Sequence, residues 1–156
     1  MTTEEARDKV EIQEAISAHG LFADCREFAA IKACTTPDAT YDYSSCFGPE
    51  FKCVRLADFL EGDEIFFLGF DATQHAISNF VIVLDGDRAS ARSHVRATHR
   101  IDKDIYVMGG MYRHQMVRLN GAWKISETAF EQTYTEGDTT LFERAAARVK
   151  AGAAKA

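Results

Sequence analysis

Asp24 and His75 have the side-chain types of a proton-transfer pair. Asp24 ends the apolar run Leu21-Phe22-Ala23, and His75 stands just before a stretch rich in β-branched residues. A histidine with an ordinary pKa of about 6.5 can exchange protons at neutral pH. A carboxylate bonded to one ring nitrogen fixes the tautomer and stabilises the imidazolium, so the other nitrogen can serve as a general base. The pattern alone also fits an aspartate exposed to solvent at a helix end.

The first half of the chain predicts the helices that would position Asp24. Thr3 can cap a helix whose first turn carries Glu4 and Glu5, because acidic residues favour the positive end of the helix dipole. Apolar residues then recur at helical spacing, and we expect this helix to run to about Asp24. The next predicted elements are a helix at Glu27–Cys34, a turn at Thr36-Pro37-Asp38, a short strand at Ala39–Tyr43 and a third helix at Leu56–Phe67.

The second half predicts the sheet that would carry His75. The expected elements are strands from Gln74 through Phe80–Leu84, at Arg88–Ile101, Ile105–Leu119 and Ala122–Tyr134, and a terminal helix at Leu141–Val149. Asp85-Gly86-Asp87 and Asn120-Gly121 are hairpin-turn signals. Helices followed by a meander of long strands indicate an α+β fold. We expect one domain over residues 1–156, with its C-terminal helix and frayed tail beginning at about residue 138.

A long, curved, mostly antiparallel sheet must cover its apolar concave face, and the N-terminal helices are the available cover. This predicts a cone with one open end, which forms a deep apolar pocket suited to a small molecule.

Alternation along the strands selects the polar residues that would face this pocket. On the first long strand, one face carries His75, Ile77, Asn79, Val81 and Val83. On the next strand, we expect the inward face to consist of Ala91, Ser93, Val95, Ala97 and His99. His94 would then point outward. Each inward histidine alone also fits a hydrogen-bonded core residue, but two of them with a carboxylate form a less common combination.

Composition excludes several kinds of partner. The formal net charge of −6 argues against nucleic acid, because phosphate binding needs a basic surface. No run is apolar and long enough to cross a bilayer, and the acidic N-terminus does not resemble a signal peptide. We therefore expect a cytoplasmic protein without membrane contact. Cys25, Cys34, Cys46 and Cys53 include no Cys-x-x-Cys pair, which favours free thiols that act as small buried hydrophobic residues.

Three segments make the chain resemble the SnoaL-like branch of the NTF2-like (cystatin-like) superfamily, and within it the scytalone dehydratases and hexachlorocyclohexane dehydrochlorinases. They are Ile12-Gln-Glu-Ala-Ile16 leading into Phe22-Ala-Asp24, Thr73-Gln-His75 before a strand, and Gly121-Ala-Trp123-Lys-Ile125 on the last strand. The resemblance spans roughly Val10 to Tyr134. The aspartate followed by a histidine at this spacing is its most specific part.

The resemblance implies catalytic roles for four residues. Asp24 and His75 match the catalytic dyad of the family, His99 matches a second active-site histidine, and Tyr43 matches a tyrosine that polarises a carbonyl group. The positions that contact the substrate in the relatives carry different residue types in this chain. Ala23 replaces a tyrosine of the dehydratases, Gly110 and Tyr112 replace their serine and asparagine, and Thr128 stands near an arginine of the dehydrochlorinases.

The resulting hypothesis is a cofactor-free lyase, closest to a dehydratase, that acts on a hydrophobic cyclic substrate. The substrate-binding candidates are Phe22, Asn79, Val95, Met108, Gly110, Tyr112, Thr128, Phe130 and Gln132. In the elimination, His75 would remove a proton next to a carbonyl or another acidifying group. A hydroxyl or another leaving group, such as the halide of a dehydrohalogenase, would depart from the neighbouring carbon with the help of a proton from His75 or His99. A ketosteroid-isomerase-like isomerase, a hydrolase and a non-catalytic binding or assembly protein are the alternatives.

No cofactor is expected, because the chain has no Gly-rich phosphate loop. A metal site built from two histidines and a carboxylate is a further alternative, which would require the three side chains to converge on one point. Assembly into a homo-oligomer, either a trimer or a dimer, is expected from the outer sheet face and from the relatives.

Overall fold

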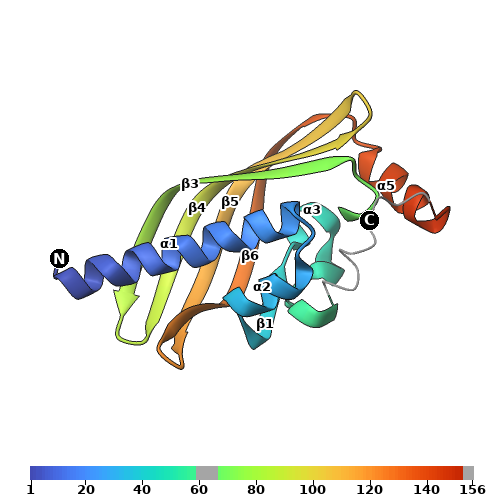
Figure 1. Ribbon diagram of the computed structural model, residues 1–156. Helices are drawn as coiled ribbons and strands as arrows, with labels where there is room; N and C mark the ends of the chain where they lie inside the picture. Colours follow the sequence, from blue (N-terminus) through green and yellow to red (C-terminus); the bar gives the residue numbers. More distant parts are fainter. Residues whose placement is uncertain (59–66, 153–156) are drawn as a thin grey trace.

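The protein folds as a curved sheet that wraps around the long helix α1 (Figure 1). The computed structural model describes residues 1–58 and 67–152. The described elements are α1 (Thr3–Asp24), α2 (Phe28–Cys34), β1 (Thr35–Asp42), α3 (Ser44–Phe47), the short 3₁₀ helix η1 (Pro49–Phe51), β2 (Val54–Arg55), β3 (Ala72–Asp85), β4 (Arg88–Ile101), β5 (Asp104–Leu119), β6 (Ala122–Gly137) and α5 (Leu141–Lys150).

The sheet has six strands in the order β2-β1-β6-β5-β4-β3. Strands β3 to β6 form antiparallel hairpins, and β1 is parallel to β6. The predicted α+β class and mostly antiparallel sheet are therefore confirmed. The predicted turn at residues 36–38 is wrong, because these residues lie within β1. The pairing of β1 with β6 is nevertheless irregular between Thr35 and Thr40, where Pro37 has no N–H to donate.

The N-terminal cap of helix α1 lies one residue earlier than predicted. Thr2, not Thr3, accepts a hydrogen bond from the backbone of Glu5, and the Glu5 carboxylate accepts one from the backbone of Thr2. This reciprocal capping box satisfies two N–H groups at the start of the helix. Along the inner face of α1, Ile12 and Ile16 are fully buried against β4, β5 and β6.

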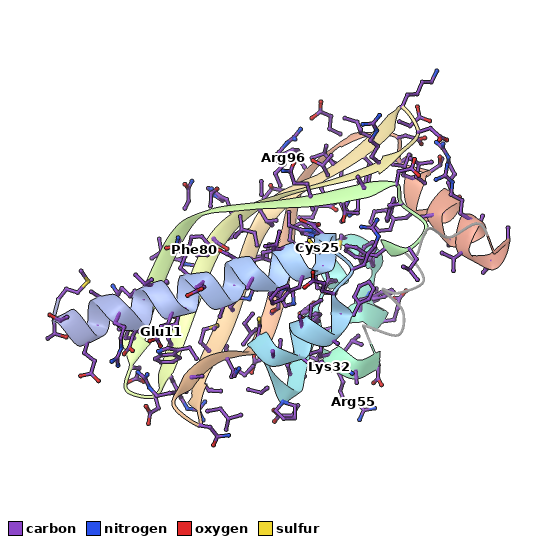
Figure 2. The ribbon with its side chains drawn as sticks, in the orientation of Figure 1. Glu11, Cys25, Lys32, Arg55, Phe80 and Arg96 are labelled. Carbon is purple, nitrogen blue, oxygen red and sulfur yellow. The ribbon has the colours of Figure 1, made fainter. Side chains whose placement is uncertain are left out.

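A bulge in β3 reverses which residues face the core. The pairing with β4 shifts between Ser78 and Val81, and Asn79 adopts a left-handed backbone conformation (φ 56°). Beyond this point Phe80 and Ile82 pack against the core, while Val81 and Val83 are exposed. Figure 2 places Phe80 beside α1. The predicted inward positions of Asn79, Val81 and Val83 are therefore wrong, because a bulge breaks the two-residue alternation.

Strand β4 has no bulge in its pairing with β5, and its predicted alternation is confirmed. Ala91, Ser93, Val95, Ala97 and His99 are all buried. His94 and Arg96 are exposed on the outer face, and Figure 2 shows Arg96 on the side of the sheet away from α1.

Gly110 serves the packing of β5 on β6. A Cβ atom at this position would lie 2.1 Å from the carbonyl oxygen of Glu131, next to a shift in the β5–β6 register. Gly110 was predicted to be a substrate-binding residue. Its missing side chain instead accommodates the backbone of the neighbouring strand.

The third predicted helix, Leu56–Phe67, falls mostly on residues 59–66, outside the described residues. Helical backbone is present at its two ends, at residues 56–58 and at Phe67. All four cysteines are free thiols, as predicted. Cys34 is buried, but Cys25 and Cys53 are exposed and so are not core residues. Across residues 1–58 and 67–152, no helix combines the length and apolarity needed to cross a membrane.

Because of the bulge, we expect substitutions at two neighbouring residues of β3 to differ in their effect on the free energy of unfolding. Ile82→Ala should lower the free energy of unfolding by about 1–3 kcal/mol, because it removes methyl groups from the core. Val83→Ala, the matched control, should change it by less than about 0.5 kcal/mol, since Val83 is 60% exposed. Urea denaturation of both variants would measure this difference. A larger loss for Val83→Ala than for Ile82→Ala would contradict the described register.

Candidate active site

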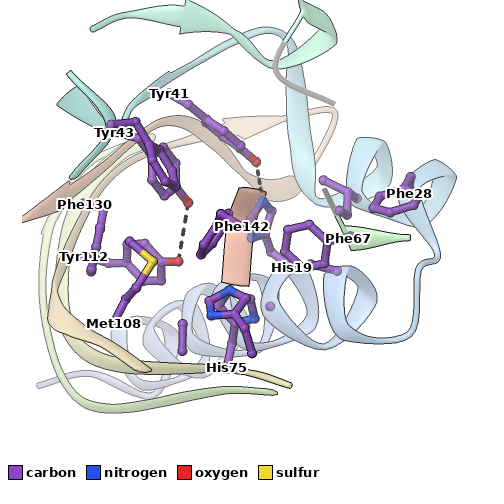
Figure 3. A pocket seen from close by; sticks show the side chains of 16 residues that line it. His19, Phe28, Tyr41, Tyr43, Phe67, His75, Met108, Tyr112, Phe130 and Phe142 are labelled. Carbon is purple, nitrogen blue, oxygen red and sulfur yellow. Dashed lines mark hydrogen bonds between the residues drawn. The ribbon is translucent and has the colours of Figure 1, made fainter. Parts of the chain in front are cut away.

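An aromatic cavity lies between the last turns of α1 and the concave face of the sheet (Figure 3). Its phenylalanine and tyrosine lining consists of Phe28, Tyr41, Tyr43, Phe47, Phe67, Tyr112, Phe130 and Phe142. Three histidines, His19, His75 and His99, also line it. Among the described residues, no lysine, arginine, aspartate or glutamate contributes to the lining. The cavity therefore offers apolar surface with a few hydroxyl and imidazole groups.

Asp24 and His75 are in direct contact, as predicted. Oδ1 of Asp24 lies 2.7 Å from Nδ1 of His75. Oδ2 accepts the backbone N–H of His75 at 2.7 Å, and Oδ1 also accepts the hydroxyl of Thr73 at 2.9 Å. The end of α1 thus holds the start of β3 through both carboxylate oxygens. The two side chains are only 13% and 11% exposed, so Asp24 is not a solvated helix end.

The protonation of this pair follows from its surroundings. Burial alone raises the pKa of Asp24, but the hydrogen bonds and charge of His75, together with the Thr73 hydroxyl, outweigh it. The net result is a pKa below the ordinary 3.8. Asp24 is therefore ionised at neutral pH and only accepts hydrogen bonds. Nδ1 of His75 must then carry a proton, and Nε2 of the neutral ring is the basic nitrogen.

Arg26 and Phe67 hold the surroundings of His75 in place. Arg26, in a left-handed conformation (φ 61°) just after α1, donates to the carbonyl oxygens of Asp24, Phe67 and Phe70. The ring of Phe67 stacks on that of His75 at 6.0 Å between centroids. The guanidinium of Arg26 therefore joins the backbone of Asp24 to the backbone of Phe67, whose ring covers the imidazole of His75.

His99 lines the same cavity, as predicted, with its ring edge-on to that of His75 at 6.3 Å. Its Nδ1 lies 3.3 Å from the carbonyl oxygen of Tyr106, so it donates its proton there. The pKa of His99 is lowered to about 4. Burial is the main cause, and the nearby charge of His75 is the second. At neutral pH, His99 is therefore uncharged, and its Nε2 can accept a hydrogen bond but has no proton to give.

Tyr43 lies at the cavity wall, as predicted, together with Tyr112. Their hydroxyl oxygens are 3.4 Å apart, and Tyr43 also packs on the ring of Phe130. Figure 3 shows this tyrosine pair on one side of the cavity and His75 on another. Two phenol groups at one place can donate to an oxygen atom that gains negative charge during a reaction.

A second polar pair, His19 and Tyr41, was missed in the sequence. Nε2 of His19 is hydrogen-bonded to the hydroxyl of Tyr41, and both residues line the cavity. Helical spacing contained a signal for His19, because it continues the inner stripe Ile12, Ile16 one turn further. Alternation also contained a signal for Tyr41, which lies two residues before Tyr43 in the predicted strand Ala39–Tyr43.

The predicted substrate-binding residues divide into two groups. Met108, Tyr112 and Phe130 line the cavity. Six others lie outside its lining: Phe22, Asn79, Val95, Gly110, Thr128 and Gln132.

The six have other roles. Phe22 and Val95 pack in hydrophobic clusters. Thr128 is hydrogen-bonded to the buried His114. Asn79 is exposed and bonded to His94 on the outer face, so its predicted contact with substrate is wrong. Gln132 lies beside the β5–β6 irregularity, where its backbone N–H donates to Ser45.

Asp24, His75 and His99 do not converge on a metal position. Asp24 is directed to Nδ1 of His75, and Nδ1 of His99 faces a carbonyl oxygen. Within the described part of the chain, no group of three or more histidine, cysteine, aspartate or glutamate side chains is arranged to hold a metal ion.

Comparison with known proteins identifies the class to which this fold and site belong. The family model for the SnoaL-like domain matches residues 4–129, and the chain therefore belongs to this family. An uncharacterized protein of Mycobacterium tuberculosis, Rv2910c, is 28% identical over 131 residues, which cover 80% of this chain and 85% of that protein.

Solved structures show the same fold. A protein of Novosphingobium aromaticivorans that is assigned as a scytalone dehydratase has a TM-score of 0.76 at 24% identity, over 88% of this chain and 92% of that one. A hexachlorocyclohexane dehydrochlorinase, LinA-type3 of Novosphingobium barchaimii, has a TM-score of 0.70 at 16% identity, over 86% and 92% of the chains. The NTF2-like, cystatin-like fold and the resemblance seen in the sequence are confirmed.

The lowered pKa of Asp24 predicts a stability difference that depends on pH. Asp24→Asn should lower the free energy of unfolding at pH 7 by about 1 kcal/mol, because it removes a charged hydrogen-bond acceptor that is partly exposed. A carboxyl whose pKa is depressed on folding stabilises the protein above its unfolded pKa, here about 3.8. This contribution is lost as the pH falls through the folded pKa.

The two proteins should therefore approach each other in stability below about pH 4. Urea denaturation at several pH values would measure this trend. A difference that stays constant from pH 7 to pH 3 would contradict ionisation of Asp24 in the folded state.

Proposed function

We propose that the protein is a cofactor-free lyase of the dehydratase type, which acts on a hydrophobic ring compound. The observation that carries this proposal is the Asp24–His75 hydrogen bond at the wall of an aromatic cavity. An ionised carboxylate fixes the tautomer of the histidine and stabilises the imidazolium. Nε2 of His75 then acts as a general base toward a substrate in the cavity, a role worth roughly 10²–10⁴-fold in rate.

The reaction begins at a carbon next to a carbonyl group. His75 takes the proton from this carbon, and negative charge develops on the carbonyl oxygen. Tyr43, with Tyr112 beside it, donates a hydrogen bond to that oxygen. A leaving group then departs from the neighbouring carbon, and a double bond forms.

The shape and polarity of the cavity support a neutral, flat substrate. Its volume is about 60 Å³, and the hollow measures about 740 Å³ with its open mouth included. A ring compound would therefore occupy the mouth as well as the interior. Aromatic walls favour such rings, and the absence of cationic side chains from the described lining disfavours carboxylate or phosphate groups.

The SnoaL-like family and the fold shared with dehydratase and dehydrochlorinase structures support the same reaction class. The polar pairs Tyr43–Tyr112 and His19–Tyr41 support a substrate that carries oxygen atoms able to accept hydrogen bonds.

The test is turnover of ring β-hydroxy ketones, followed by mass spectrometry. The wild-type protein should release a product lighter by one water, whereas an isomerase would leave the mass unchanged. His75→Gln should lower turnover by about 10²–10⁴-fold, because the general base is lost. His94→Gln is the matched control, since His94 is exposed on the outer face of the same sheet. Full activity of His75→Gln on a confirmed substrate would overturn the mechanism.

A further inference from the structure

An elimination needs a proton donor for its leaving group as well as a base. His75 is the base, and Tyr43 and Tyr112 are placed to bind the carbonyl oxygen. His99 does not suit the remaining role, because its Nδ1 proton is donated to the Tyr106 carbonyl and its Nε2 is unprotonated at neutral pH. Besides the His75 imidazolium that the first step forms, a donor can come from another hydroxyl on the described cavity wall.

Among the described residues, His19 and Tyr41 form another polar pair in the cavity lining. Tyr41 comes from β1 and His19 from the penultimate turn of α1, and their rings meet edge to face at 5.6 Å. Figure 3 shows the pair on a different side of the cavity from the hydroxyls of Tyr43 and Tyr112. A ring substrate in the cavity can thus meet His75 and both hydroxyl sites through different atoms.

The His19 ring lies inside the protein, although part of its surface is accessible. His19 also lines the cavity. Burial, followed by the charge of His75, lowers the pKa of His19 to about 4. At neutral pH, His19 is therefore an uncharged partner of Tyr41. Only the tautomer with its proton on Nε2 donates to the phenol oxygen and directs the phenol's own proton toward a substrate oxygen.

We propose that Tyr41 is the general acid for a hydroxyl leaving group and that His19 is its positioning residue. This inference rests on the proposed function and names its substrate class: a neutral ring compound with a carbonyl group and a hydroxyl on the second carbon from it. The carbonyl oxygen binds at Tyr43 and Tyr112, and the hydroxyl binds at Tyr41. The leaving group is water and not halide, because halide departs without a proton.

The proposed steps conserve atoms and charge. Nε2 of His75 takes the proton of the carbon next to the carbonyl, and the C–H electrons form the enolate. The carbonyl then re-forms, a carbon–carbon double bond appears, and the C–O bond breaks with its electron pair on oxygen. That oxygen takes the Tyr41 proton and leaves as water. The released water carries a proton from the His75 imidazolium to the Tyr41 phenolate, which restores the enzyme.

The first experiment compares leaving groups on one ring system. The substrates are a β-hydroxytetralone and the β-acetoxytetralone, whose acetate leaves without protonation. Tyr41→Phe should lower kcat on the hydroxy compound by about 10²-fold and on the acetoxy compound by less than about threefold. Tyr43→Phe is the matched control and should lower both equally, since it acts on the enolate. Equal losses with Tyr41→Phe, or no loss, would overturn the acid role.

His19 variants separate positioning from packing. His19→Leu should reproduce the leaving-group selectivity of Tyr41→Phe, whereas His19→Gln, which keeps an N–H donor, should recover part of the rate on the hydroxy compound. A melting curve for each variant establishes that the protein is folded. Loss of rate on both substrates alike in His19→Leu would show a purely structural role.

Binding of unreactive probes tests the hydroxyl site without turnover. Tyr41→Phe should weaken binding of β-tetralol about tenfold, the effect of one hydrogen bond, and leave tetralin binding unchanged. If the wild-type protein eliminates neither tetralone, the proposed function is wrong. In that case, selective weakening of tetralol binding still supports Tyr41–His19 as a hydroxyl site, and unchanged tetralol binding overturns it.

Discussion

The candidate site depends on how closely helix α1 packs on strand β3. Gly20 makes this approach possible, because a Cβ atom there would lie 2.9 Å from Cδ1 of Ile77 and 3.4 Å from Cβ of His75. Asp24 follows one turn later, and its carboxylate reaches both the backbone and the ring of His75. A side chain at position 20 would have to displace the end of the Ile77 side chain, and a large one would also press on His75. The missing side chain therefore favours the close packing that brings Asp24 to His75.

The same packing explains why Asp24 contacts His75, a contact that pattern alone left open. A helix-end aspartate looks the same in sequence whether it is solvated or buried against a strand. The family resemblance supplied the pairing with His75, and the structure supplies its physical basis. His19 lies on the same face of α1 but carried no such resemblance. Its role becomes visible only when β1 places Tyr41 opposite it.

Strand alternation predicted side-chain direction only where the pairing is regular. The face of β4 was correct over its whole length, so His99 was placed in the cavity from sequence. On β3 the bulge at Asn79 reverses the direction of every later residue. Asparagine tolerates a positive φ, but nothing in the local sequence distinguishes this bulge from a continuous strand. The errors at Asn79 and Val83 therefore have a single origin.

Around the cavity, the described residues place the ionised Asp24 beside neutral histidines, and this would direct proton transfer in the proposed reaction. Burial lowers the pKa of His19 and of His99 to about 4, and that of His114 to about 3. None of the three competes for a proton at neutral pH. His75 differs because the ionised Asp24 accepts from its Nδ1, so an added proton forms an ion pair and not an isolated buried charge. In the proposed reaction, the ionised Asp24 would stabilise the imidazolium of His75, and the tyrosine hydroxyls would donate hydrogen bonds to the oxygen atoms of the substrate.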